Sequence, residues 1–210
     1  MNVVINRIEE TDFSYHDVVI LMHEAFKERL EQGLRYTCSF ITEAQFRVKS
    51  FGGIVFVAID KGCGELVGTM TLNYPQTRSD KYGYMEYVAV RNDAKMLGIG
   101  SKMFDCLQKN AVENGCKYLL SDTSTSANSA VKWHLKLGFK IIGFESYHST
   151  NYWSYVFRKQ LVPSKKWTSN VYCRFRYILS WIFIRSTRDS NGNDNVLGRF
   201  LKAIIRKCKN

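Results

Sequence analysis

The feature that most constrains this sequence is a strand-like segment, 82–90, followed by a glycine-bearing loop that opens a helix. Gly98 and Gly100 stand where the helix should begin. The first turn of a helix presents backbone N–H groups without helical partners, and together with the positive end of the helix dipole these groups bind phosphate. Glycine lets the backbone approach such an anion because no Cβ intervenes. The junction predicts an anion site, with a tight turn that binds nothing as the alternative.

Helical and strand-like patterns flank this junction on both sides. Ser14 followed by Asp17 predicts a capped helix whose apolar stripe runs to Leu30, interrupted by Arg29. Segments rich in β-branched and aromatic residues between turns predict strands. The fold class expected from this order is α+β, a sheet with helices on its faces. The predicted strands are 3–8, 53–60, 65–74, 82–90, 117–121, 139–147 and 152–158. Two helices are predicted to begin at 15 and 43, and two more to span 99–114 and 128–137.

Composition indicates a globular protein that needs neither disulfides nor a metal. A chain of 210 residues with 45% hydrophobic residues can bury a core of ordinary size. Its six cysteines include no C-x-x-C pair, which argues against a zinc site and against a disulfide framework, so we expect reduced thiols and no metal. The N-terminus lacks a basic segment leading into a long apolar run, so a cytoplasmic location is expected.

The positive charge is concentrated in the C-terminal extension, residues 161–210. This extension has 11 Lys and Arg residues against two acids, a net charge of +9 out of the total of +11, which leaves +2 for residues 1–160. Residues 196–208 place apolar side chains on one helical stripe, with most of the basic ones elsewhere. Such a helix binds an anionic membrane surface or a partner, or packs on the domain itself. Nucleic acid is disfavoured because no recognised binding motif accompanies the charge.

Two motifs resemble those of the GNAT superfamily of acyl-CoA-dependent N-acetyltransferases. The run Lys95-x-x-Gly98-x-Gly100 resembles the R/Q-x-x-G-x-G/A signature of that family, although Lys replaces the usual Arg or Gln. The run from Asn128 to Phe139, NSAVKWHLKLGF, resembles its second motif, N-x-x-A-x-x-F-Y-x-K-x-G-F. A dinucleotide-binding unit would need G-x-G-x-x-G, which is absent. The resemblance covers about residues 3–158 and implies a mixed, mostly antiparallel sheet flanked by helices.

The resemblance also implies how acetyl-CoA, the expected cosubstrate, would bind. Main-chain groups of the strand would pair with the pantetheine arm, and amides of the loop that follows would bind the pyrophosphate. Lys95 could meet a phosphate as a point charge, whereas Arg would offer a planar fork. Asn128 would contact the pantetheine arm. The coenzyme-binding residues predicted in this way are Val88, Ala89, Val90, Lys95, Met96, Leu97, Gly98, Ile99, Gly100, Ser101 and Asn128.

The catalytic candidates follow from the reaction of the family, in which an amine attacks the thioester directly. Such a site needs a base for the ammonium proton and a donor for the oxyanion. Glu86 is the predicted base, with a solvated strand carboxylate as the alternative; Tyr84 shares its strand face. The N–H of Val88 or Ala89 is the predicted oxyanion donor. His134 stands where the family usually has Tyr and is the predicted general acid, with a packed structural histidine as the alternative.

The sequence as a whole predicts two parts, an N-acetyltransferase domain at 1–160 and a basic, partly amphipathic extension at 161–210. The expected activity is transfer of an acetyl group from acetyl-CoA to an amine of a small molecule, such as an amino sugar or a sugar nucleotide. The alternative is a non-catalytic acyl-CoA-binding or membrane-recruited module. Attachment to the inner face of the membrane and a homodimer are left open.

Overall fold

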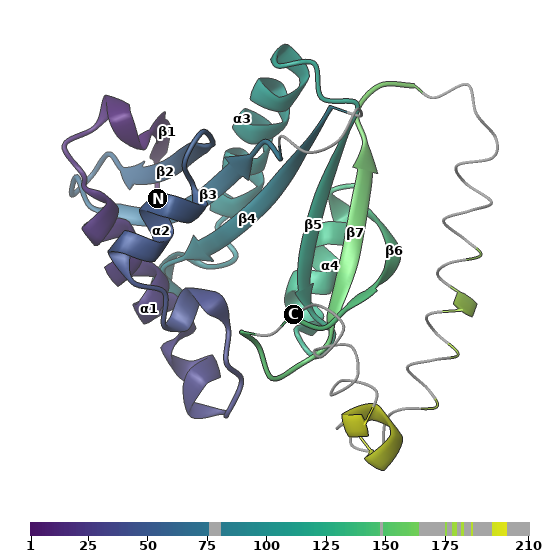
Figure 1. Ribbon diagram of the computed structural model, residues 1–210. Helices are drawn as coiled ribbons and strands as arrows, with labels where there is room; N and C mark the ends of the chain where they lie inside the picture. Colours follow the sequence, from purple (N-terminus) through teal and green to yellow (C-terminus); the bar gives the residue numbers. More distant parts are fainter. Residues whose placement is uncertain are drawn as a thin grey trace. The chain divides into compact units, whose positions relative to one another are not determined.

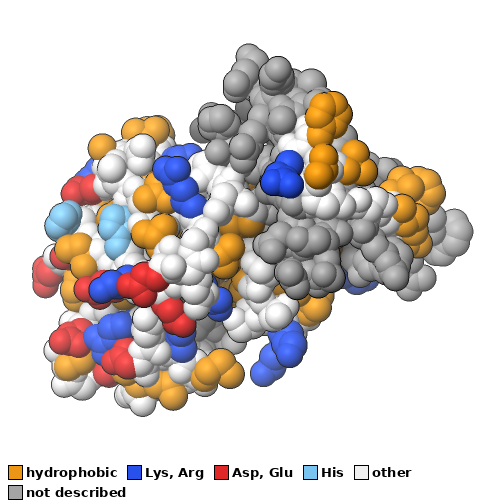
Figure 2. Space-filling model, turned by 90° about the horizontal axis from the view of Figure 1, so that it is seen from below, with side chains coloured by type: hydrophobic (Ala, Val, Ile, Leu, Met, Phe, Trp, Pro, Cys, Tyr) orange, Lys and Arg blue, Asp and Glu red, His pale blue; other side chains and the backbone are white. Residues whose placement is uncertain are grey.

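The computed structural model describes residues 1–75, 81–147, 149–163 and 195–200, and five single positions between them, 175, 178, 179, 182 and 186. The chain divides into two units, Met1–Ser121 and Asp122–Asn210. The predicted boundary near residue 160 falls inside the second unit and stays a prediction. Acidic and basic side chains intermingle over the left of the molecule in Figure 2, as expected for a region of low net charge.

The first unit contains a sheet whose strands lie in the order β1-β2-β3-β4-β5. Neighbours from β1 to β4 pair antiparallel, and β4 pairs with β5 in parallel. The predicted strands 53–60 and 65–74 thus form an antiparallel hairpin, and the expected mixed, mostly antiparallel pairing is confirmed. The strands are β1 (Val3–Arg7), β2 (Ile54–Asp60), β3 (Leu66–Asn73), β4 (Tyr82–Val90) and β5 (Tyr118–Ser124), of which residues 118–121 belong to the first unit.

Helices cover both faces of this sheet (Figure 1). α1 (Tyr15–Glu31) and α2 (Glu43–Lys49) pack on one face, and α3 (Ile99–Glu113) packs on the other. α1 begins as predicted. The Ser14 Oγ accepts a hydrogen bond from the Asp17 N–H at 3.3 Å, and the Asp17 carboxylate accepts one from the Ser14 N–H at 2.7 Å. Three short 3₁₀ turns, 8–10, 37–39 and 92–94, were not predicted, since one turn is too short to show a period.

The two faces bury different side chains of the same strands. Val55 and Val57 of β2 join the apolar cluster beneath α1 and α2. On the other face, Gly68 of β3 lies beneath α3; a Cβ there would come within 2.9 Å of the Met103 Cε, so the end of that side chain would have to shift. Leu107, one turn further along α3, is buried like Met103. Residues that pair directly across the sheet share a face, so the register assigns each polar strand residue to one of these helical layers.

The second unit contains α4 (Asn128–Lys136) and an antiparallel pair, β6 (Lys140–Glu145) and β7 (Ser154–Gln160). α4 ends within a residue of the predicted 137, where Gly138 follows with a φ of 87°, and the Lys159 Nζ donates to the Leu137 carbonyl at 2.6 Å. Most of the C-terminal extension lies outside the described residues. Residues 196–200 are helical, and the rest of the predicted helix, to residue 208, also lies outside the described residues. Within the described part of the chain, no helix is long and apolar enough to span a bilayer.

Candidate functional site

β4 contains a bulge directly after Glu86. The register pairs Glu86 with Thr71 and Ala89 with Thr69, so Met70 of β3 stands opposite two residues of β4, Tyr87 and Val88. Tyr87 has a φ of 51°, a left-handed conformation that is unusual for an aromatic residue. A bulge of this kind bends the strand and turns its backbone groups away from the regular ladder. The strand is therefore irregular at the residues predicted to contact the acyl group.

The pairing of β4 with β5 stops at the same place. The parallel register includes Tyr82 to Met85, and its last pair is Met85 with Ser121. The Ser121 hydroxyl donates to the Met85 carbonyl at 3.0 Å and fixes that end of the ladder. Residues 86–90 of β4 thus lie beyond its last parallel pair with β5. An extended arm laid along them could use main-chain hydrogen bonds, as peptides do at a sheet edge.

A loop with two left-handed residues leads from β4 into α3. Arg91 anchors its start through ion pairs with Glu65 at 2.6 Å and Asp93 at 2.7 Å. Met96 then has a φ of 65° and Gly98, the residue that caps α3, a φ of 79°. The Met96 side chain is 97% exposed, so the left-handed conformation does not serve to bury it.

The predicted anion site lies at the end of this loop, in the segment named here the amide loop, residues 96–101. The first hydrogen bond of α3 runs from the Lys102 N–H to the Gly98 carbonyl at 3.0 Å. The amides of residues 98–101 precede that bond, and helical geometry supplies no intrahelical acceptor for them. They stand at the positive end of a helix of 15 residues. The geometry expected for a phosphate site at a helix N-terminus is present.

Lys95 stands immediately before the amide loop, with an exposed side chain. Partial desolvation, followed by the positive charge of Arg29, lowers the pKa of the Lys95 ammonium, and Glu28 opposes that effect. Positive charges from α1 and from the loop are therefore near one another at this end of the sheet. Such a pair favours an anion between or beside them.

Glu86 lies on the face of the sheet covered by α1 and α2. Its partner in the register, Thr71, pairs in turn with Val55, which belongs to the cluster beneath those helices. The half-buried carboxylate accepts a hydrogen bond from the Asn73 Nδ2 at 2.7 Å. Tyr84 pairs with Asn73 in the register and shares this face, as the sequence predicts.

His134 is buried in an aromatic cluster of the second unit. It is 4% exposed, and its ring stacks on Phe157 at 4.5 Å between centroids, with Phe139 edge-on at 5.5 Å. Burial lowers the pKa of His134 to about 4, so the ring is neutral at pH 7. The Nδ1 lies 2.8 Å from the Ala130 carbonyl. Because a carbonyl only accepts, Nδ1 carries the proton and Nε2 is left as an acceptor.

The predicted site residues are divided between the two units of the chain. Glu86, the positions of β4 predicted to contact the coenzyme, and the amide loop are consecutive parts of the first unit. Asn128, the exposed first residue of α4, and His134 belong to the second unit, and their predicted roles stay predictions. No group of three metal-ligating side chains occurs within the described ranges. Sequence reasoning missed Asn73, whose signal is an alternation of polar residues, Thr69, Thr71 and Asn73, along an otherwise apolar strand.

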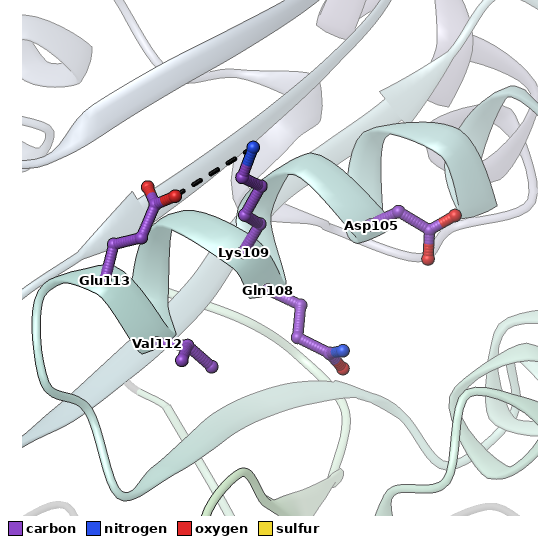
Figure 3. A pocket seen from close by; sticks show the side chains of 5 residues that line it. All are labelled: Asp105, Gln108, Lys109, Val112 and Glu113. Atoms are coloured by element: carbon purple, nitrogen blue, oxygen red, sulfur yellow. Dashed lines mark ion pairs between the residues drawn. The ribbon is translucent and has the colours of Figure 1, made fainter.

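A shallow hollow on α3 lies away from this site. Figure 3 shows its lining side chains along α3, with Lys109 and Glu113 paired at 4.0 Å. The five residues span 105–113, whereas the amide loop ends at the first turn of α3. The hollow therefore does not mark the anion site. Its lining residues are Asp105, Gln108, Lys109, Val112 and Glu113.

The conformation of Gly98 gives a first prediction. Gly98→Ala is expected to lower the free energy of unfolding by about 1–2 kcal/mol, because a residue with a Cβ is strained in the left-handed region. Gly100→Ala is the matched control: Gly100 lies inside the helix, where alanine is favoured over glycine by about 1 kcal/mol. Urea denaturation of both variants measures the difference. Equal stability of the two variants would contradict the left-handed turn at Gly98.

Comparisons with known proteins agree with this geometry. The family model described as Acetyltransferase (GNAT) family matches residues 16–139. A GNAT-family acetyltransferase from Staphylococcus aureus Mu50 is similar in structure, with a TM-score of 0.58, 16% identity, and coverage of 77% of this chain and 100% of that one. A GNAT-family acetyltransferase from Streptococcus pneumoniae gives a TM-score of 0.56 at 18% identity, covering 76% and 99% of the two chains.

A third similar structure is an aminoglycoside 6′-N-acetyltransferase complexed with coenzyme A. Its TM-score is 0.59 at 15% identity, with coverage of 78% of this chain and 99% of that one. At such identities these structures show a shared fold. A search of curated proteins found no significant match.

Proposed function

The chain belongs to the GNAT family of acetyltransferases, and from this premise we propose that it acetylates a small-molecule amine by direct attack on acetyl-CoA. Membership makes the protein an acyltransferase that takes its acyl group from a CoA thioester and passes it to an amine. The predicted alternative, a non-catalytic acyl-CoA-binding module, is not favoured. The identity of the amine and the roles of individual residues belong to the proposal.

One observation supports the proposal above the others: the bulge of β4 and the amide loop are joined within a few residues. The bulge lies at Tyr87 and Val88, and the amide loop begins at Met96. A coenzyme whose diphosphate bound the amides of 98–101 could extend its pantetheine arm along residues 88–90. The thioester would then meet the irregular part of the strand beside Glu86. This order matches the order of groups in acyl-CoA.

The reaction needs few groups from the protein. The amine nitrogen bonds to the thioester carbon, the carbonyl oxygen becomes an oxyanion, and its collapse breaks the carbon–sulfur bond. We assign the N–H of Val88 or Ala89 to the oxyanion and the Glu86 carboxylate to the ammonium proton. Holding both reactants in line, removing the proton and stabilising the oxyanion each contribute to the rate enhancement. Coenzyme A leaves as the thiolate or the thiol.

The environment of His134 restricts its predicted role as proton donor to that thiolate. A pKa of about 4 leaves the ring neutral at pH 7, and the bond to Ala130 leaves Nε2 without a proton. A donor role would require a change of tautomer. We therefore favour the structural role that the sequence left open, in which the ring packs between aromatic side chains. The thiolate would then take its proton from water.

The proposed acceptor is an amine that enters over the face bearing Glu86 and Tyr84. A carboxylate on this face favours an ammonium ion over a neutral or anionic acceptor. The structural neighbour that acts on an aminoglycoside supports an amino sugar as one candidate class. Sugar nucleotides that carry a free amine are a second candidate class.

A panel of amines tests this function directly. Purified full-length protein is incubated with acetyl-CoA and amino sugars, amino-sugar nucleotides, amino acids or polyamines, and release of the CoA thiol is followed. Turnover with at least one amine, together with the N-acetylated product, is the expected result. Tight binding of acetyl-CoA without transfer to any amine would favour the non-catalytic module.

A further inference from the structure

Asn73, the last residue of β3, links Glu86 to the end of α2. Its Nδ2 donates to the Glu86 Oε2 at 2.7 Å and lies 3.2 Å from the Lys49 carbonyl oxygen, to which it also donates. Neither an ionised carboxylate nor a carbonyl can donate, so the amide must turn its NH₂ group toward both. Both of its hydrogens are then used on partners that come from different elements. The side chain is fixed in one orientation.

The amide fits in this place because residue 53 is a glycine. A Cβ on Gly53 would collide with the Asn73 Oδ1 and come within 2.7 Å of the Leu72 carbonyl oxygen. The Gly53 N–H donates to the Ser50 carbonyl at 2.9 Å, which holds the turn after α2 in position. Gly53 therefore provides the space in which the Asn73 side chain can reach Glu86.

We infer that Asn73 is the positioning residue for the base of the reaction and holds the Glu86 carboxylate toward the acceptor face. Gly53, which has no side chain, leaves the room that the Asn73 amide needs. The inference rests on the proposed role of Glu86. A hydrogen bond to a carboxylate restricts its rotation and favours the ionised form over the protonated one. Asn73 thus keeps Glu86 both oriented and ready to accept a proton from the ammonium group.

The experiment measures the pKa of the Glu86 carboxyl group by ¹³C NMR titration in the full chain, without any substrate. In Asn73→Ala the pKa is expected to rise by roughly one unit, because one hydrogen bond to the charged form is lost. Asn73→Asp keeps the shape of the side chain but places a second carboxylate beside the first, so a larger rise is expected. An unchanged pKa in both variants would overturn the inference.

Thr71→Val is the matched control. Thr71 pairs directly with Glu86 in the register, but its buried hydroxyl makes no hydrogen bond among the described residues. Its replacement is expected to leave the pKa of Glu86 unchanged. The other titratable groups beside Glu86 and at the junction of α1 with α2 stay the same in every variant, so their contributions cancel. These groups include Tyr84 and Tyr87 on β4, and Tyr15, His16, His23, Glu43, Arg47 and Lys49 on α1 and α2.

Gly53→Ala offers an independent route to the same change, since it displaces the amide without altering Asn73 itself. It is expected to raise the pKa of Glu86, as Asn73→Ala does. A pKa equal to that of the parent protein would contradict the role of Gly53 in leaving room for the Asn73 amide. Coenzyme A binding, measured in parallel, is expected to be unchanged in all four variants. Once an acceptor is known, the acid limb of kcat/KM should move with the measured pKa. Absence of transfer with every amine would refute the proposed function and leave the titration result intact.

Discussion

Replacing Glu86 by glutamine is expected to lower kcat for acetyl transfer by about 10²- to 10⁴-fold, the usual contribution of a general base. The substitution removes the proton acceptor but keeps an oxygen that can accept a hydrogen bond from the Asn73 Nδ2. In the parent protein this bond to the carboxylate is 2.7 Å long. The fold should therefore survive, and the affinity for coenzyme A should be unchanged. Steady-state kinetics with the best amine of the panel, beside calorimetry with coenzyme A, separates the two effects.

Glu113→Gln provides the control for this prediction. Glu113 is an exposed carboxylate at the end of α3, paired with Lys109 at 4.0 Å, and its loss should leave kcat within about twofold, as for most surface substitutions. If Glu86→Gln also retained parental kcat, Glu86 would be a solvated strand carboxylate, and the base would have to be sought elsewhere.

His134 is expected to make the protein less stable in acid by about 3 kcal/mol, and His134→Phe should remove that loss. The pKa falls from 6.5 to about 4 on folding, because burial disfavours the charged ring. Below pH 6.5 the unfolded chain binds a proton that the folded chain does not, so the free energy of unfolding decreases as the pH falls toward 4. A shift of this size corresponds to about 3 kcal/mol. Above pH 6.5 this group contributes no pH dependence.

Urea denaturation of the parent and His134→Phe at several pH values between 4 and 8 measures this effect. Phenylalanine matches the aromatic surroundings formed by Phe139 and Phe157, so similar stability is expected at pH 8. Carboxylates change the stability of both proteins in acid, and the difference between the two curves removes their contribution. Parallel curves would show that His134 is not buried in its neutral form.

Local signals predicted most of the secondary structure. The capping pair Ser14 and Asp17 lies within one turn of the start of α1, so it can be read without knowledge of the fold. The same holds for the amide loop, since Gly98 and Gly100 precede an apolar stripe. These elements lie where the sequence predicts them, within a few residues.

Features that depend on register or packing could not be predicted. The bulge at Tyr87 exists only relative to β3, and the bond between Asn73 and Glu86 joins residues 13 apart through that register. Likewise, the neutral state of His134, on α4, depends on burial against Phe157, which comes from β7. The sequence therefore indicated the chemistry of the site, whereas the orientation of its side chains required the tertiary structure.

Calorimetry with coenzyme A and acetyl-CoA tests the central claim most directly, because the account depends on a diphosphate bound by the amides that open α3. Folded full-length protein is expected to bind both compounds at one site per chain, with a dissociation constant between about 1 μM and 1 mM, as is usual for enzyme substrates. Pantetheine, which lacks the diphosphate, should bind far more weakly. Absence of binding by coenzyme A and acetyl-CoA to folded protein would contradict the account.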